Sequence, residues 1–352
     1  MKNKFITGQN QKHIIQLREL LKELPDFLQA FFRGISETTA IRTRVAYAYD
    51  LKLFFNFLLE NKYPETADIR NFGLEVLEKI DPDDIERYME YLSYYIYVGA
   101  DRTEDRHNSE YGKSRKLAAL RTMYSYYYKK RKVMNNPSEL VDFPKIYQRN
   151  IIKLEVNEVA VLLDEVDSGT NLTERQQKFH KLIRSRDLAI VTLLLGTGMR
   201  VSECVGVNIH DLDFDINGVR ITRKGGNEAI VYFGQEVETA LRDYICERKE
   251  IAAKQGHDDA LFLSLQRKRI TTRAVQNLVK KYAHLATPIK TITPHKLRST
   301  FGTNLYMESG DIYLVADALG HSDVNTTKKH YAQIEDSRRK EVVKYIKLRE
   351  ED

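Results

Sequence analysis

The chain has 352 residues, enough for two domains, and its 42% hydrophobic and 30% charged residues allow sizeable buried cores in a water-exposed fold. A formal net charge of +6 favours a polyanionic partner, and only two cysteines, Cys204 and Cys246, argue against a disulfide framework and for a reducing cytoplasm. The chain contains no run of about 18 apolar residues, so no membrane span is predicted. The N-terminal segment lacks the apolar stretch of a secretory signal.

The first part of the chain is predicted to be helical. Apolar residues recur every three or four positions over 41–60, and Asp81-Pro82 marks the start of a second helix expected to run to residue 98. A polar loop is expected over 99–112, followed by a third helix over 113–133. Four cation-rich segments together favour a nucleic-acid surface, although each alone is as readily a solvated helix face: IRTRVAYAYD, GKSRKLAALR, YYYKKRK and LQRKRITTR.

Two prolines and an Asn-Asn pair predict a linker at 141–152, which separates a domain of residues 1–140 from a domain of residues 153–352. The second domain is expected to contain one hairpin, with two strands flanking a Lys-Gly-Gly-Asn turn inside 217–233. Its predicted helices cover 155–166, 186–198, 237–253, 271–286, 293–309, 312–320 and 337–351. The predicted fold class is therefore mainly α with a small antiparallel β-sheet.

The helix expected at 293–309 carries candidate anion-binding side chains in its first turns. Thr293 suits the N-cap and Pro294 the first helical position, so His295 and Arg298 follow on one face of the helix. A helix N-terminus attracts anions through its free N–H groups, and this pair would add an imidazole and a guanidinium. An ordinary capped helix with surface cations is the alternative interpretation.

Two further cations stand next to glycine turns. Arg200 follows the buried helix that ends at Gly-Thr-Gly, and Glu203 is placed three residues on to pair with it. Lys224 lies on the predicted hairpin turn, where it could reach into a groove and donate a proton. The alternatives are a structural Arg200–Glu203 ion pair and an exposed hairpin lysine.

The segment LGHSDVNTTKKHY supplies the remaining candidates. Gly320 is expected to end a helix, His321 follows it directly, and Tyr331 lies ten positions further on across a short loop. The six candidates form a cationic cage with a phenol nucleophile, and no spacing suits zinc, calcium or a Walker loop. Such a set predicts phosphoryl transfer by positioning, charge neutralisation and covalent catalysis, without a cofactor.

The motifs GTGMRVSE, RKGGNE, HKLRSTFGTNL and LGHSDVNTTKKHY follow one another in the order Arg…Lys…His-x-x-Arg…His…Tyr. In this the chain resembles the tyrosine recombinases of the phage integrase superfamily, over about residues 153–335. Within that superfamily it is similar to the Xer branch, most to the single-recombinase XerS type. The first domain resembles the family's helical core-binding domain by pattern only.

The resemblance implies a role for each motif position. Arg200 and Arg298 would bind the scissile phosphate, Tyr331 would attack it, Lys224 would protonate the leaving 5′ oxygen, His295 would assist proton transfer at the tyrosine, His321 would hydrogen-bond the phosphate, and Glu203 would orient Arg200. It also implies a two-domain C-shaped clamp on double-stranded DNA, with Arg42, Arg44, Lys113 and Arg115 as candidate contacts of the first domain. No metal and no membrane partner are expected.

The implied activity is site-specific DNA recombination through a 3′-phosphotyrosyl intermediate, resolving chromosome dimers at a dif-like site during cell division. The last helix is expected to dock in trans within a tetramer on two DNA sites, with docking in cis as the alternative. The DNA translocase FtsK is a candidate partner. Alternative functions are the integrase of a mobile element, a type IB topoisomerase-like enzyme, and a DNA-binding regulator that no longer cleaves.

Overall fold

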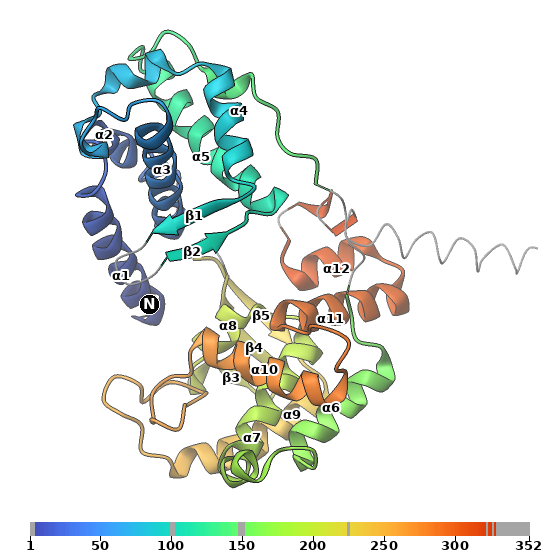
Figure 1. Ribbon diagram of the computed structural model, residues 1–352. Coiled ribbons are helices and arrows are strands. Elements are labelled where there is room, and N and C mark those ends of the chain that lie inside the picture. The colour runs from blue at the N-terminus through green and yellow to red at the C-terminus, as the bar shows by residue number, and fades with distance from the viewer. Residues whose placement is uncertain are drawn as a thin grey trace, which may run out of the picture. The chain divides into compact units, whose positions relative to one another are not determined.

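The computed structural model describes most of the chain, as two compact units (Figure 1). The described residues are 4–98, 103–146, 152–223, 226–321, 323–325 and 327–328. The two units are Met1–Arg149 and Asn150–Asp352, and their boundary falls inside the segment predicted as a linker. Both are mainly helical with one small antiparallel sheet each, which confirms the predicted fold class. No helix within these ranges is long and apolar enough to cross a membrane.

The first unit is built from helices that pack around α3. Its helices are α1 (Lys4–Leu21), α2 (Phe27–Gly34), α3 (Ile41–Asn61), α4 (Pro82–Tyr91) and α5 (Glu110–Lys129); short 3-10 turns are η1 (Ile69–Asn71), η2 (Leu74–Lys79) and η3 (Pro137–Glu139). The start of α4 agrees with the prediction: the Asp81 carboxylate accepts the N–H of Asp84 at 2.9 Å, and the Asp84 carboxylate accepts the N–H of Asp81 at 3.0 Å.

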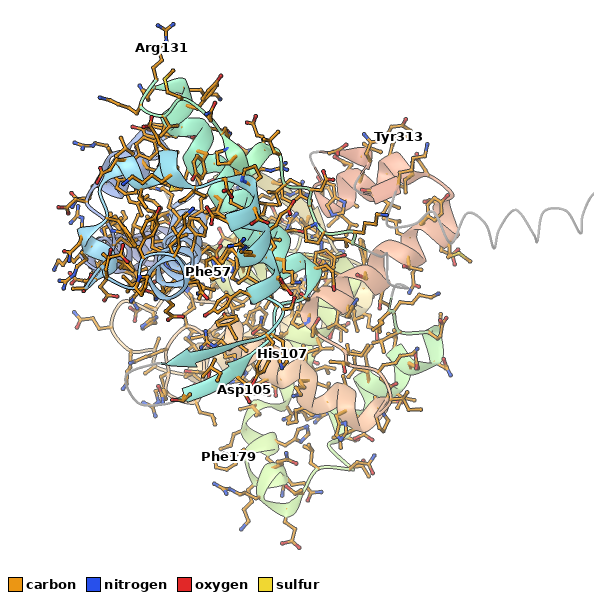
Figure 2. The ribbon with its side chains drawn as sticks, turned by 45° about the horizontal axis from the view of Figure 1, so that its top comes forward. Phe57, Asp105, His107, Arg131, Phe179 and Tyr313 are labelled. Carbon is orange, nitrogen blue, oxygen red and sulfur yellow. The ribbon has the colours of Figure 1, made fainter. Side chains whose placement is uncertain are left out.

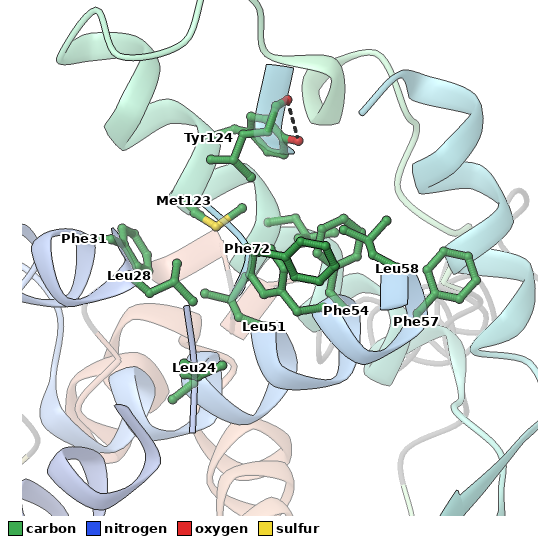
Figure 3. Packing of buried hydrophobic residues seen from close by; sticks show 14 of the residues in the cluster. Leu24, Leu28, Phe31, Leu51, Phe54, Phe57, Leu58, Phe72, Met123 and Tyr124 are labelled. Atoms are coloured by element: carbon green, nitrogen blue, oxygen red, sulfur yellow. Dashed lines mark hydrogen bonds between the residues drawn. The ribbon is translucent and has the colours of Figure 1, made fainter. Parts of the chain in front are cut away.

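Aromatic rings fill the core of this unit (Figure 3). The ring of Phe54 on α3 meets that of Tyr88 on α4 edge-on, with the centroids 5.0 Å apart. The Tyr124 hydroxyl of α5 is buried and donates to the carbonyl oxygen of Leu77 at 3.2 Å. Many of the tyrosines and phenylalanines in this half of the chain therefore serve packing.

The expected second helix is wrong beyond residue 91. The chain leaves α4 there and forms a hairpin of β1 (Tyr95–Val98) and β2 (Thr103–Arg106), with Tyr95 opposite Arg106. Tyr95 is buried and Ile96 exposed, which is the alternation of a strand. Tyrosine, isoleucine and valine also favour strands over helices, so tertiary pairing overrides the apparent helical spacing.

The second unit carries the predicted hairpin within a three-stranded sheet. Its strands are β3 (Leu212–Asp213), β4 (Gly218–Thr222) and β5 (Glu228–Tyr232), in the order β3-β4-β5; its helices are α6 (Val156–Ser168), α7 (Glu174–Thr197), α8 (Val201–Gly206), α9 (Gln235–Glu250), α10 (Thr272–Ala286), α11 (Pro294–Ser309) and α12 (Ile312–Leu319), with the 3-10 turn η4 (Ile209–Asp211) between α8 and β3. Strands β4 and β5 pair antiparallel around the predicted turn, with Arg220 opposite Ile230.

Helix α7 begins earlier than the sequence pattern indicates. Thr173 and Gln176 form a capping box at its start, where the Thr173 N–H donates to Gln176 Oε1 at 3.0 Å. Most side chains of its first two turns are exposed, that of Phe179 among them (Figure 2), so this half shows no apolar periodicity. The buried second half ends at Gly198, whose φ of 62° lies in the left-handed region that glycine adopts at little cost.

Candidate active site

Helix α11 places His295 and Arg298 as the sequence predicts. Thr293 occupies the N-cap position and Pro294 the first helical position. Arg298 is buried, with 5% of its surface exposed. Its Nη1 donates to the carbonyl oxygen of Gly198 at 2.7 Å, and its Nη2 donates to that of Leu319. These carbonyls stand at the C-terminal ends of α7 and α12, so one guanidinium joins three helices.

Arg200 lies three residues past the end of α7 and directly before α8. Its Nη1 lies 2.9 Å from Glu203 Oε1, and its main-chain N–H donates to Glu203 Oε2 at 2.7 Å. The expected pairing of the two residues is confirmed. The Glu203 side chain is 4% exposed and that of Arg200 is 36% exposed. The Glu203 carboxylate therefore holds both the main-chain N–H and the guanidinium of Arg200, while part of the arginine side chain remains exposed to a ligand.

His295 lies in the first turn of α11 among positive charges. Partial burial lowers the pKa of its imidazole, and Lys296, Arg298 and Arg200 lower it further. Because Arg200 lowers the pKa of this ring, the start of α8 lies close enough to the first turn of α11 for their charges to interact. Because the pKa falls below the usual value of about 6.5, the ring is neutral at pH 7 and can accept a proton.

His321 follows the C-terminal turn of α12. Gly320 has a φ of 63°, the left-handed cap that the sequence predicts. The His321 N–H donates to the Ala316 carbonyl oxygen at 2.9 Å, and its Nδ1 lies 2.7 Å from Thr327 Oγ1. The first contact fixes the main chain of His321 and the second orients its ring, two residues after Leu319, whose carbonyl oxygen accepts from Arg298.

Lys224 and Tyr331 lie outside the described residues, but the flanks of Lys224 are described. At the base of its turn the Arg223 N–H donates to the Asn227 carbonyl oxygen at 2.7 Å, and the Gly226 N–H donates to the Arg223 carbonyl oxygen at 3.1 Å. The Arg223 guanidinium rests against Gly320, where a Cβ atom would collide with it. The hairpin that carries Lys224 therefore adjoins the end of α12.

The four candidate DNA contacts of the first unit differ in burial and in their hydrogen-bond partners. Arg42 is exposed on α3, whereas Arg44 is half-buried with an Nε atom that has no hydrogen-bond partner. The Lys113 ammonium donates to Ser93 Oγ at 2.6 Å near the β1–β2 hairpin. Arg115 Nη1 donates to a carboxylate oxygen of Asp50 at 2.6 Å.

Two further cations of the segment GKSRKLAALR, Lys116 and Arg121 on α5, are used in contacts within the protein. Lys116 is buried, 3.7 Å from a carboxylate oxygen of Asp50 and 2.8 Å from Asn108 Oδ1. Arg121 donates to two carbonyl oxygens in the segment 138–141 and covers the ring of Phe143. Sequence reasoning could not detect these uses, because the partners lie outside α5, where helical periodicity does not predict a contact.

The described part of the site is a cluster of cations with few opposing acids. His295 and Arg298 come from α11, Arg200 from the start of α8 and His321 from the end of α12, and they converge on the junction of α7, α11 and α12. The described ranges contain no group of three or more His, Cys, Asp or Glu side chains that could hold a metal ion. Such an arrangement suits a phosphate, held by charge-assisted hydrogen bonds.

Comparison with known sequences and structures supports this chemistry. The family described as "Phage integrase family" matches residues 154–338, a range that contains all six predicted catalytic residues. Tyrosine recombinase XerC of Caldanaerobacter subterraneus subsp. tengcongensis is 33% identical over 351 residues, covering 96% of this chain and 91% of the relative. Tyrosine recombinase XerS of Lactococcus lactis subsp. cremoris is 28% identical over 351 residues, covering 90% and 94%.

A solved structure shares the fold. The crystal structure of the XerH site-specific recombinase bound to a palindromic difH substrate, a post-cleavage complex, aligns with a TM-score of 0.61 at 21% identity. The alignment covers 86% of this chain and 78% of that one.

Proposed function

The chain belongs to the phage integrase family, and from that premise we propose that the cations around α11 and α12 hold a DNA phosphate for attack by Tyr331. The chain is a tyrosine recombinase, an enzyme that cleaves and rejoins DNA. The main support for this site is the Arg298 guanidinium, which is buried and fixed by carbonyls of two other helices. A guanidinium whose orientation is fixed in this way can bind phosphate oxygens through charge-assisted hydrogen bonds.

In the proposed reaction the Tyr331 hydroxyl oxygen attacks phosphorus as its proton passes to His295. The neutral state of that imidazole, which follows from its lowered pKa, suits this role. The bond from phosphorus to the 5′ oxygen breaks, and Lys224 protonates the leaving oxygen. Arg200 and Arg298 bind the non-bridging oxygens, where charge develops.

The products are a 3′-phosphotyrosine and a free 5′-hydroxyl. A 5′-hydroxyl from a partner strand then attacks the phosphotyrosine and restores a phosphodiester of similar energy. The exchange therefore needs neither a nucleoside triphosphate nor a cofactor, and we assign none. His321, which Thr327 holds in place, would hydrogen-bond the same phosphate.

The biological role that we infer is the resolution of chromosome dimers at a dif-like site by a single Xer recombinase of the XerS type, in the cytoplasm. Similarity to XerS over 90% of the chain supports this type. Two duplexes carry four strands to be exchanged, so four protomers would assemble on two sites. Activation by a translocase of the FtsK kind belongs to the same proposal. Integration of a mobile element is the second candidate, because it uses the same chemistry.

The decisive test is capture of a covalent complex. A duplex nicked near the cleavage point lets the small cut fragment diffuse away, so the phosphotyrosyl complex accumulates. Wild-type protein should form this complex in the presence of EDTA. Tyr331→Phe should bind the same DNA and form none, because it lacks the attacking oxygen. Covalent complexes that persist in Tyr331→Phe would show that another residue is the nucleophile.

The same capture carried out in cells identifies the DNA site. Sequencing of the trapped DNA should return one chromosomal locus near the replication terminus if the protein resolves dimers. Scattered junctions at element ends would instead assign it to a mobile element. Either result leaves the active-site proposal intact, whereas an absence of trapped DNA would contradict it.

A further inference from the structure

We propose that Arg223 is a further DNA-binding residue of this site, and that its guanidinium binds a backbone phosphate next to the one that Tyr331 attacks. The inference rests on the proposed function and names a contact beyond the six motif residues. Arg223 is the last residue of the described chain before Lys224.

The main chain of Arg223 is fixed on both sides of the hairpin turn. Its N–H donates to the Asn227 carbonyl oxygen at 2.7 Å, and its own carbonyl oxygen accepts the Gly226 N–H at 3.1 Å. These two hydrogen bonds fix the Cα position of Arg223, from which the side chain extends. Little conformational freedom of the main chain is lost when such a residue binds a ligand.

The side chain of Arg223 lies against α12. A Cβ atom on Gly320 would collide with Nη1, Cζ and Nε of the guanidinium, so the whole group covers this glycine. Gly320 also has a φ of 63°, which L side chains rarely adopt. Both its conformation and its neighbour therefore require glycine here, and the close approach brings Arg223 beside His321.

Two guanidinium groups approach the end of α12, an arrangement that favours binding of an anion there. Arg298 Nη2 donates to the carbonyl oxygen of Leu319, and Arg223 covers the next residue, so two guanidinium groups meet one short stretch of chain. Within the described ranges no hydrogen bond or ion pair of the Arg223 guanidinium is present, although the side chain is half-buried. Arginine binds phosphate oxygens with two parallel hydrogen bonds, which a DNA backbone can supply.

A structural role is the competing explanation. A cation near the C-terminal end of a helix is stabilised by the helix dipole, by about 0.3–1 kcal/mol. In that case Arg223 would stabilise α12 and would not contact DNA. The salt dependence of DNA binding separates the two roles, because each phosphate contact adds about 0.9 to the slope of log K against log salt.

The experiment uses the full chain in a Tyr331→Phe background, so that binding occurs without cleavage. The probe is the duplex recovered by covalent capture with the wild-type protein. Affinities are measured from about 50 to about 200 mM salt, the interval over which phosphate contacts dominate. Arg223→Gln should lower the slope by about 0.9, and Arg223→Lys should keep it, since an ammonium also releases a counterion.

Thermal unfolding of each variant sets a temperature at which all are folded during the binding assay. An unchanged slope in Arg223→Gln would overturn the proposal, whether or not its melting temperature falls. A lowered slope in Arg223→Gln together with a retained slope in Arg223→Lys would support it. Failure to capture any covalent complex with the wild type would instead contradict the function on which the inference rests.

Discussion

The guanidinium of Arg298 donates to main-chain carbonyls, whereas that of Arg115 donates to a carboxylate. A carbonyl oxygen orients a guanidinium without adding a full negative charge, and under the proposed function Arg298 binds a phosphate oxygen. Asp50 opposes the charge of Arg115, and burial raises the pKa of Asp50 to about 6 against the opposite effects of Arg115 and Lys116. Under the proposed function the first cation binds DNA, whereas the second joins α5 to α3.

Arg115→Ala should therefore destabilise the first unit before it affects recognition. The change leaves the buried Asp50 carboxylate with Lys116 as its nearby cation, and we expect the free energy of unfolding to fall by about 2 kcal/mol. The matched control is Arg42→Ala, an exposed cation on α3, which should change it by less than about 0.5 kcal/mol. Urea denaturation measures both, and equal losses would argue against a structural Arg115.

Sequence spacing could predict local partners at this scale and no others. Arg200 and Glu203 are three positions apart at a helix start, so their pairing follows from helix geometry. The partners of Arg298 lie 100 and 21 positions away, and a main-chain carbonyl has no signature in a sequence. Arg223 was missed although it stands beside Lys224, because the glycine that it covers lies in another element.

Elements with repeating apolar faces were predictable, and elements defined by pairing were less so. The hairpin β4–β5 was predicted because a glycine-rich turn marks it, whereas β1–β2 lacks that turn and was interpreted as a helix and a loop. Helix α7 was predicted only over its buried half. A capping box at Thr173 was the sequence signal that could have extended it.

The segment 153–155, which follows the linker, is fastened to the elements of the active site. Lys290 Nζ lies 3.1 Å from the carbonyl oxygen of Lys153. The N–H of Leu154 donates to Thr300 Oγ1 of α11 at 2.9 Å. The N–H of Glu155 donates to Glu158 Oε2 at 2.8 Å, and Lys290 Nζ donates to the same oxygen at 2.6 Å. The segment that follows the linker is therefore bonded to α11, the helix that also carries Arg298.

Thr300→Val should loosen this attachment. It leaves a buried N–H without an acceptor, which costs about 1–3 kcal/mol, and it should lower the rate of covalent complex formation because α11 positions Arg298. Thr300→Ser keeps the acceptor and is the matched control. Unfolding and trapping with the nicked duplex are measured on both variants. A Val variant as stable and as active as the Ser variant would show that the contact is dispensable.

Each unit of the molecule packs its own hydrophobic residues, and Val141, at the start of the predicted linker, belongs to the core of the first unit. Under the proposed function the predicted linker lets two separately folded parts bind one duplex. Cleavage chemistry requires residues of the second unit alone, while exchange between duplexes requires several protomers. The property that separates a recombinase from a DNA-relaxing relative is therefore assembly.

The C-terminal segment 341–348, which lies outside the described residues, provides the test of that assembly. It has the sequence EVVKYIKL, and its apolar side chains would dock on a neighbouring protomer. The double variant Val343→Ser and Ile346→Ser should still bind a single DNA site, because the proposed DNA contacts remain, but should fail to join two sites. Lys344→Ser with Lys347→Ser, from the same segment, should join them. Native gel mobility and particle mass report one-site and two-site complexes separately. Normal pairing of two sites by the apolar variant would mean that this segment does not dock on a partner.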